Sequence, residues 1–367
     1  MKNVRKEKGI EIAKKEDQIE RIEDHYYKVK SQTADRIYDV VNTEIGWVCS
    51  CPDNTFRRVC CKHIHAVEFS IKIREQVKKN VTIQPIIVQA CQLCNSEKIV
   101  KNALRHNKYG DIQRYLCKSC GKRFSINLGF ERMKASPKTI TSAMQLYFTG
   151  ESLRNVQKFL NLQGIDVNHV TIYRWIDKYV GLMQKYLNQI QPQVSNTWRA
   201  DELFIKVQGN LKYLFAMMDD ETRFLIAQEV ADTKNNHDAK NLFRKSKEIA
   251  GKKPAKLITD GLPAYREAYL KEFWTRKEPR VVHESHITLK GDRNNNKMER
   301  LNGEIRDREK VVRGLKKNES PLIDGYQIYH NYIRPHMSLD GKTPSEVAGI
   351  KIEGKDKWIT LIQNASK

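Results

Sequence analysis

The stretch TWRADELFIKV, residues 197–207, decides how the second half of the chain folds. Its polar and apolar residues alternate, which is the pattern of a β-strand with two unlike faces. Asp201 falls on the same face as the aliphatic residues Leu203, Ile205 and Val207. An ionised carboxylate on such a face is costly to bury unless a cation or strong hydrogen-bond donors compensate it. The pattern therefore predicts that Asp201 holds a partner.

Strand and helix patterns alternate after this stretch. Strands are expected at 198–207, 211–219 and 223–231, then a helix at 236–250, a strand ending at 260, a helix at 263–273, a short strand at 280–286, and helices from about 294 and 320. Three strands in hairpin succession followed by alternating helices and strands indicate a mixed sheet covered by helices. We therefore expect an α/β fold here.

The charge balance points to an anionic partner. Lys and Arg number 66 against 44 Asp and Glu, a formal net charge of +22. Such an excess is typical of nucleic-acid binding, although a merely soluble basic protein would also show it. No apolar run approaches the roughly eighteen residues that cross a bilayer, and the first thirty residues carry no signal core. We expect an intracellular, cytoplasmic and nucleoid-associated protein without membrane contact.

All eight cysteines lie in the first third of the chain, between Cys49 and Cys120. In a reducing compartment this clustering favours metal binding over disulfides. The first group is a Cys-x-Cys pair followed by a Cys-x-His pair, and together they can supply four soft ligands to tetrahedral Zn²⁺. The spacing resembles a SWIM zinc finger. The expected ligands are Cys49, Cys51, Cys61 and His63, with Cys60 and His65 as possible alternatives.

A second cysteine group consists of two CxxC knuckles. Cys91 and Cys94 form the first, and Cys117 and Cys120 form the second, in an arrangement that resembles a zinc ribbon. Structural zinc has all four positions filled by protein, so neither module is expected to be catalytic. We expect both to present basic residues to phosphate. These residues are Arg57, Arg58, Arg105, Arg114, Lys118, Lys122 and Arg123.

Residues 136–180 show three short helical patterns with a glycine in the turn before the last. This arrangement resembles a helix-turn-helix, in which the third helix contacts DNA. The spacing is also common in small structural bundles. On the DNA-binding interpretation, the contacting residues are Asn168, His169, Thr171 and Arg174.

Two further acids complete a candidate site with Asp201. Asp260 ends an apolar strand, where chemistry gathers in open sheets, and Glu299 borders the apolar stripe of a predicted helix. Carboxylates from separate elements suit two Mg²⁺ ions, which would compensate Asp201. Glu202, Asp219 or Asp220 could replace a member of the trio. Asn302, Arg306, Lys310 and Arg313 follow Glu299 on roughly the same line of this helix, and their cations form a basic ridge leading from it.

The sequence motifs around these acids resemble the DDE-type insertion-sequence transposases of the retroviral-integrase superfamily. The motifs are ADE at Asp201, LITDGLPAY at Asp260, NNKMER at Glu299 and the later segment YHNYIRPHMSLDGKTPSEVAGI. The resemblance implies a ribonuclease-H-like fold, catalysis by Asp201, Asp260 and Glu299 with two Mg²⁺ (or Mn²⁺) ions, and cleavage and joining of double-stranded DNA at element ends and target. It also implies a homo-oligomer on DNA.

Six segments are expected along the chain. They are a charged arm at 1–35, a SWIM-like finger at 36–80, a zinc ribbon at 85–130, a helix-turn-helix at 136–185, a ribonuclease-H-like core at 195–350 and a tail at 351–367. Two other functions stay open. One is a transposase-derived DNA-binding regulator without turnover, and the weaker one is a ribonuclease-H-like nuclease acting on RNA.

Overall fold

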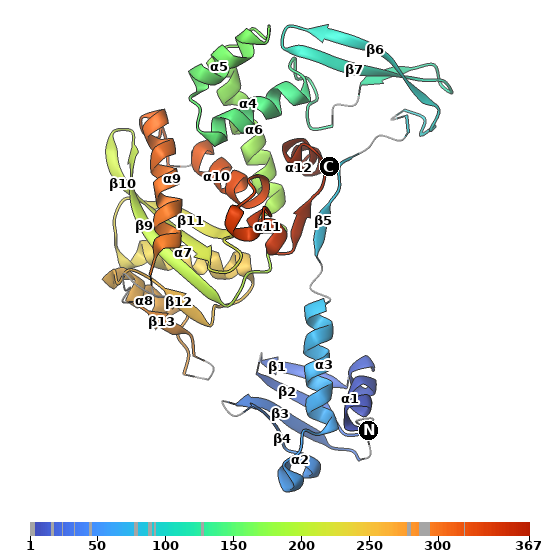
Figure 1. Cartoon of the computed structure of the whole chain (residues 1–367), viewed down its shortest axis with the longest axis vertical. Coiled ribbons are helices and arrows are strands. Elements are labelled where there is room, and N and C mark those ends of the chain that lie inside the picture. Colours follow the sequence, from blue (N-terminus) through green and yellow to red (C-terminus); the bar gives the residue numbers. More distant parts are fainter. Residues whose placement is uncertain are drawn as a thin grey trace. The chain divides into compact units, whose positions relative to one another are not determined.

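The computed structural model separates the chain into two compact units, Met1–Lys79 and Asn80–Lys367 (Figure 1). The structure describes residues 4–15, 18–23, 25–32, 34–43, 46–76, 80–86, 90–91, 93–125, 128–276, 280–285, 294–318 and 320–367. No helix within these ranges has the length and apolar character needed to cross a membrane.

The first unit is a four-stranded antiparallel sheet with helices packed on it. The sheet order is β1 (Ile19–Glu23), β2 (Tyr26–Lys30), β3 (Ile37–Thr43) and β4 (Gly46–Cys49). The helices are α1 (Val4–Lys14), α2 (Pro52–Arg57) and α3 (Lys62–Gln76), and α3 contacts all four strands as well as α1. The four strands therefore form a single platform for α3.

The expected charged arm at residues 1–35 is part of this unit instead. Residues Ile19–Glu23 and Tyr26–Lys30 form two strands of the sheet, and they continue it antiparallel to β3 and β4. The reason is packing: Tyr27 and Val29 alternate inward on β2, and Ile12 of α1 is 2% exposed in the same core. A few apolar residues suffice because α3 covers them.

The second unit begins with a small antiparallel sheet and three helices. The sheet contains β6 (Ile99–Asn107), β7 (Gly110–Cys117) and β8 (Arg123–Ser125). The helices are α4 (Pro137–Thr149), α5 (Leu153–Leu162) and α6 (His169–Leu187). Ser136, Ser152 and Asn168 cap their amino-terminal ends by accepting backbone N–H groups. The three helices that the patterns of residues 136–180 predicted are therefore confirmed.

A five-stranded mixed sheet follows, in the order β11-β10-β9-β12-β13. The strands are β9 (Thr197–Val207), β10 (Asn210–Asp219), β11 (Leu225–Ala231), β12 (Lys256–Ile258) and β13 (Val282–Glu284). The first three are antiparallel, and β12 and β13 run parallel to β9. The mixed sheet that the order of strand and helix patterns predicted is therefore confirmed.

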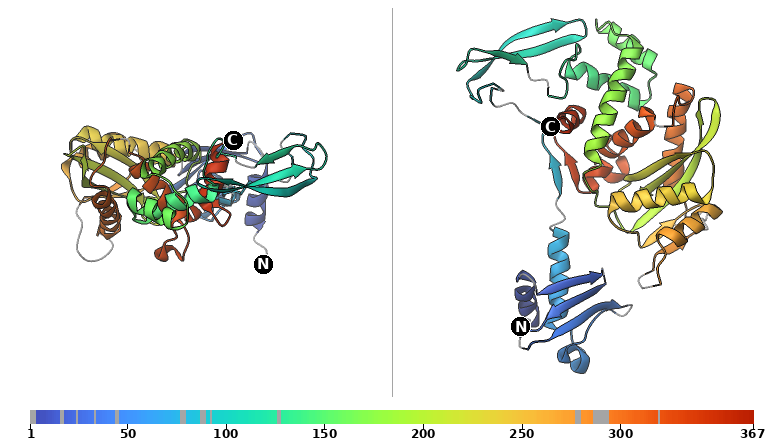
Figure 2. Two further views of the ribbon diagram at one scale, coloured as in Figure 1. Left: turned by 90° about the horizontal axis from the view of Figure 1, so that it is seen from above. Right: turned by 180° about the vertical axis from the view of Figure 1, so that it is seen from behind.

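Helices cover both faces of this sheet. Figures 1 and 2 show α7 (Asn236–Ala250) and α8 (Pro263–Glu272) on one face and α9 (Asn296–Val312) on the other. On the same side as α9, the helix α10 (Pro321–Ile328) packs against α6. One continuous core therefore joins the sheet to the three-helix segment.

The predicted tail at 351–367 is also part of the core. After a wide helical turn (Tyr329–Ile333), a 3-10 turn (Met337–Leu339) and α11 (Pro344–Val347), the strand β14 (Ile350–Ile352) pairs in parallel with β5 (Val81–Ile83). The last helix, α12 (Lys357–Ala365), carries Trp358, which stacks on Phe148 of α4 at 5.6 Å and donates a hydrogen bond to Gln145. Burial of its apolar face explains why this segment is ordered.

Candidate active site and metal centres

Asp201 lies on β9 with the alternation that the sequence predicted. Leu203, Ile205 and Val207 are at most 2% exposed, whereas Phe204 on the opposite face is 48% exposed. The partner of Asp201 is Asn302 of α9, whose Nδ2 donates a hydrogen bond to Oδ2 over 2.8 Å. The helix that covers this face therefore supplies the first compensating donor.

Strand register brings Asp260 to the same place. The parallel pairing of β12 with β9 sets Ile258 opposite Arg199, so Asp260, two residues on, emerges beside Asp201. Beyond Arg199, no described strand pairs with this edge of β9 until the bridge between Val207 and Leu315. Side chains from both faces of β9 can reach this open edge.

A third acid, Glu202, joins them from the opposite face. One carboxylate oxygen from each of Asp201, Glu202 and Asp260 lies within 4.8 Å of the others. Burial raises the pKa of Asp201 to about 7, and the charges of Asp260 and Glu202 add to the effect. Burial and the charge of Glu202 also raise the pKa of Asp260. These acids are crowded, so their ionised forms call for a cation.

Glu299 is an exposed residue in the first turn of α9. It does not belong to the group within 4.8 Å formed by the described acids. It precedes Asn302 by three residues, which places the two side chains on neighbouring positions of one helix face. Its charge also contributes to the raised pKa of Asp201. The role of Glu299 as third ligand stays a prediction.

Two alternative acids have structural partners instead. Asp219 is fully buried and accepts hydrogen bonds from the backbone and hydroxyl groups of Ser195 and Thr222. Asp220 forms ion pairs with Arg199 and Lys297, which lower its pKa against the effect of burial. Neither joins the acidic group around Asp201.

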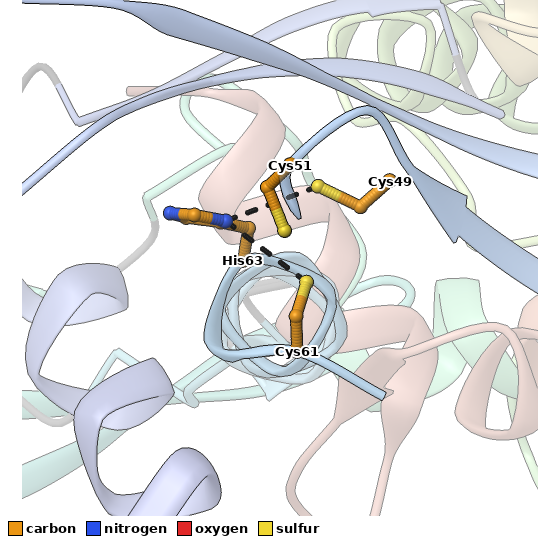
Figure 3. Close-up of side chains that lie close together, drawn as sticks. All are labelled: Cys49, Cys51, Cys61 and His63. Carbon is orange, nitrogen blue, oxygen red and sulfur yellow. Dashed lines mark hydrogen bonds between the residues drawn. The ribbon is translucent and has the colours of Figure 1, made fainter. Parts of the chain in front are cut away.

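The first cysteine group converges as expected (Figure 3). Ligand atoms of Cys49, Cys51, Cys61 and His63 all lie within 4.8 Å of one another, and each residue is buried. Nδ1 of His63 faces the sulfurs of Cys49 and Cys61 at 3.8 and 3.9 Å. Zn–S bonds of about 2.3 Å at a tetrahedral centre separate ligand atoms by roughly 3.8 Å, so the set fits zinc.

Cys60 and His65 stand apart from that set. The Cys60 sulfur lies 3.8 Å from Nδ1 of His65, which is itself 3.1 Å from a carboxylate oxygen of Glu68. These three residues form a separate, less buried group at the start of α3. They are therefore not alternative ligands of the buried group in this conformation.

The second cysteine group also converges. The sulfurs of Cys91 and Cys120 are 3.8 Å apart, and those of Cys94 and Cys117 are 3.5 Å apart. All four thiols are free, since a disulfide bond would be about 2.05 Å long. The separations suit four sulfur ligands around one tetrahedral ion, as the CxxC spacing predicted.

Comparison with known proteins identifies the sheet region. A family model described as a DDE domain, of the IS240 transposase type, matches residues 195–336. Residues 195–336 form a DDE transposase domain. This range contains Asp201, Asp260 and Glu299. It also contains Glu202, which lies beside Asp201 and Asp260, and Asn302, which donates a hydrogen bond to Asp201.

Curated relatives named as transposases match part of the chain. The transposase for the insertion sequence-like element IS431mec of Staphylococcus aureus (strain Mu50 / ATCC 700699) is 30% identical over 120 residues, 33% of this chain and 53% of that relative. The transposase for insertion sequence element IS257 in transposon Tn4003 of Staphylococcus aureus shows the same identity and coverage. The chain spans about half the length of these relatives.

A solved structure of the HTLV-2 integrase catalytic core domain in complex with magnesium aligns with a TM-score of 0.32. It is 16% identical, and the alignment covers 43% of this chain and 99% of that one.

Most of the residues predicted to contact DNA have solvent-exposed side chains. Arg306, Lys310 and Arg313 are exposed on and just after α9 of the DDE domain. Arg174 is exposed on α6, whereas His169 and Thr171 are half-buried. The Asn168 side chain caps α6 by accepting the Val170 N–H. Contact of these residues with DNA stays a prediction.

Sequence reasoning missed two residues beside the acids. Tyr265 is fully buried on α8 and Lys234 precedes α7, and both donate to the Glu202 carboxylate. The only available signal for Tyr265 was its place in LITDGLPAY, five residues after Asp260. Lys234 had none, because its approach to the acids depends on tertiary structure.

Proposed function

We propose that the chain is an insertion-sequence transposase that cleaves DNA strands at element ends and joins the resulting 3'-hydroxyl ends to target DNA. The observation that carries the proposal is the meeting of Asp201, Glu202 and Asp260 within 4.8 Å inside a DDE transposase domain. A protein that only binds DNA has no physical reason to crowd negative charges beside its phosphate ligand. The relatives named as transposases support the same assignment.

The acidic group suits Mg²⁺ or Mn²⁺. Its donors are carboxylate oxygens, which these hard ions prefer. Oδ1 of Asn302 is buried and has no hydrogen-bond partner among the described residues, so it can accept a bond from a metal-bound water or from substrate. Asp201, Asp260 and Glu299 would hold the ions. Two bound ions would activate the attacking oxygen and stabilise the leaving oxygen of an in-line phosphoryl transfer.

The remaining residues position the acids and the DNA. Asn302 fixes the carboxylate of Asp201 through its 2.8 Å hydrogen bond. The exposed cations on and just after α9, Arg306, Lys310 and Arg313, would contact phosphates near the cleaved bond. The helix-turn-helix formed by α4, α5 and α6 would bind element ends, and the two zinc modules would each hold one structural Zn²⁺. Two element ends handled together call for a homo-oligomer on double-stranded DNA.

The test measures strand cleavage and joining with the full-length protein and DNA from the ends of its own element. Asp201→Asn, Asp260→Asn and Glu299→Gln should each abolish both steps and keep DNA affinity within about threefold, because phosphate contacts of other residues dominate affinity. Glu229→Gln serves as the control, since Glu229 pairs with Lys245 on the same sheet away from the acids.

The outcomes separate the alternatives. Wild-type protein that binds the ends and never joins them would favour the DNA-binding regulator. Cleavage of RNA in preference to DNA would favour the nuclease. Substantial joining by one acid variant would remove that acid from the site.

A further inference from the structure

Glu202 holds an unusual position for a residue that faces away from Asp201 on the strand. Its side chain is 6% exposed, yet its carboxylate lies within 4.8 Å of Asp201 and Asp260. Burying a third carboxylate beside two others is costly, and a neutral side chain of similar shape would remove the repulsion. The position of the charge therefore calls for an explanation beyond packing.

Two donors fix the Glu202 carboxylate, one at each oxygen. The Tyr265 hydroxyl donates to Oε2 over 2.8 Å, and Lys234 Nζ donates to Oε1 over 2.8 Å. The Tyr265 ring is itself immobilised, because it stacks on Phe243 with centroids 5.9 Å apart and meets Phe215 edge-on. Each oxygen of Glu202 keeps a free lone-pair direction after these bonds.

Lys234 is likewise held at a defined place. Its Nζ lies 4.9 Å from the ring centroid of Phe204 and 5.1 Å from that of Tyr213, within the range of cation–π attraction. The Nζ group is thus a fixed positive charge 2.8 Å from a carboxylate oxygen of Glu202. Its charge also acts on Asp260.

We propose that Glu202 is a fourth carboxylate of the metal site, that Tyr265 positions it, and that Lys234 is the cation that offsets it. This inference rests on the proposed function, since it assumes that the acids bind a divalent ion. It assigns opposite effects to two partners in one ion pair. Loss of the Glu202 charge weakens attraction for a divalent cation, whereas loss of the Lys234 charge removes a competing cation and strengthens it.

The experiment measures Mn²⁺ binding by calorimetry or electron paramagnetic resonance on the full-length protein with its zinc sites loaded. Glu202→Gln should weaken Mn²⁺ affinity roughly tenfold or more, and Tyr265→Phe should weaken it by a smaller factor, in the range seen for residues that orient metal ligands. Lys234→Met should strengthen it a few fold. Glu229→Gln is the matched control for losing a Glu–Lys pair on this sheet.

The direction in which each substitution changes Mn²⁺ affinity decides the inference. If Glu202 only braced the connection before α7, Glu202→Gln and Lys234→Met would both lower thermal stability and leave Mn²⁺ affinity within about twofold, which would overturn the proposal. If Lys234→Met weakened Mn²⁺ affinity as much as Glu202→Gln does, the proposed role of Lys234 would be overturned. If Glu202→Gln fails to fold, Tyr265→Phe and Lys234→Met still give the comparison. Unchanged Mn²⁺ affinity in Asp201→Asn would refute the metal site itself, and with it the proposed function.

Discussion

Replacing Asp201 by Asn should make the protein more stable while destroying its activity. The carboxyl has a pKa of 3.8 in an unfolded chain and about 7 in the folded protein, because burial and the neighbouring acids disfavour its charge. Ionised Asp201 therefore costs folding about 4 kcal/mol at most. Asn has the same shape and no charge, but it accepts a weaker hydrogen bond from Asn302 than a carboxylate does. We expect a net gain of about 2–4 kcal/mol.

The dependence on pH follows from the same pKa. Below about pH 4 the carboxyl is protonated in both states and Asp201 imposes no cost. The cost grows as pH rises toward 7, where the folded protein also ionises, and is constant above it. The difference between variant and wild type should therefore be larger at pH 8 than at pH 5.

Thermal unfolding in magnesium-free buffer, with zinc bound, measures this difference. Each kcal/mol corresponds to about 2–4 °C in the melting temperature of a domain of this kind. Added Mg²⁺ or Mn²⁺ should raise the melting temperature of the wild type and leave that of Asp201→Asn nearly unchanged. A folded variant that melts at or below the wild-type temperature at pH 8 would refute the idea that the acids are electrostatically crowded.

Two further predictions concern the zinc modules and the core. Elemental analysis should give about two zinc ions per chain, and Cys49→Ser and Cys91→Ser should each lose about one, because each removes one ligand of a four-ligand set; fewer than about one ion in the wild type would contradict both assignments. Gly325→Ala should destabilise the second unit by about 1–3 kcal/mol, because a Cβ there would lie 2.2 Å from Cζ of Phe148. Gly181→Ala on α6 meets no atom within 4 Å and should stabilise by about 0.5–1 kcal/mol, so equal effects of the two substitutions would show that the contact is absent.

Sequence patterns over a few residues predicted the strands, helices and cysteine groups that form between near neighbours in the chain. The alternation of TWRADELFIKV and the following helix pattern placed β9 and α7 within a residue of their observed bounds. Cysteine spacing predicted both four-ligand groups, because two residues separated by only one or two positions can bind the same metal ion. Asn302 was expected on the same helix line as Glu299, and it contacts Asp201.

The differences have tertiary causes. Residues 19–30 and 357–365 look polar or isolated in the sequence, and they fold because α3 in the first case and α4 in the second cover their apolar side chains. Glu202 was placed on the far face of β9 by alternation, which is correct for its backbone. Its carboxylate nevertheless reaches Asp260 because β12 ends early and exposes the edge of β9.

The pairing of β14 with β5 has a consequence for synthesis of the protein. The parallel partner of Val81–Ile83 and the indole that stacks on Phe148 both belong to segments translated after the helices α4 to α6 and the five-stranded sheet. During synthesis these earlier parts emerge with a strand edge and an apolar surface still uncovered, while the first unit already has its complete core. Chains interrupted before residue 350 should therefore contain an intact first unit attached to an aggregation-prone remainder.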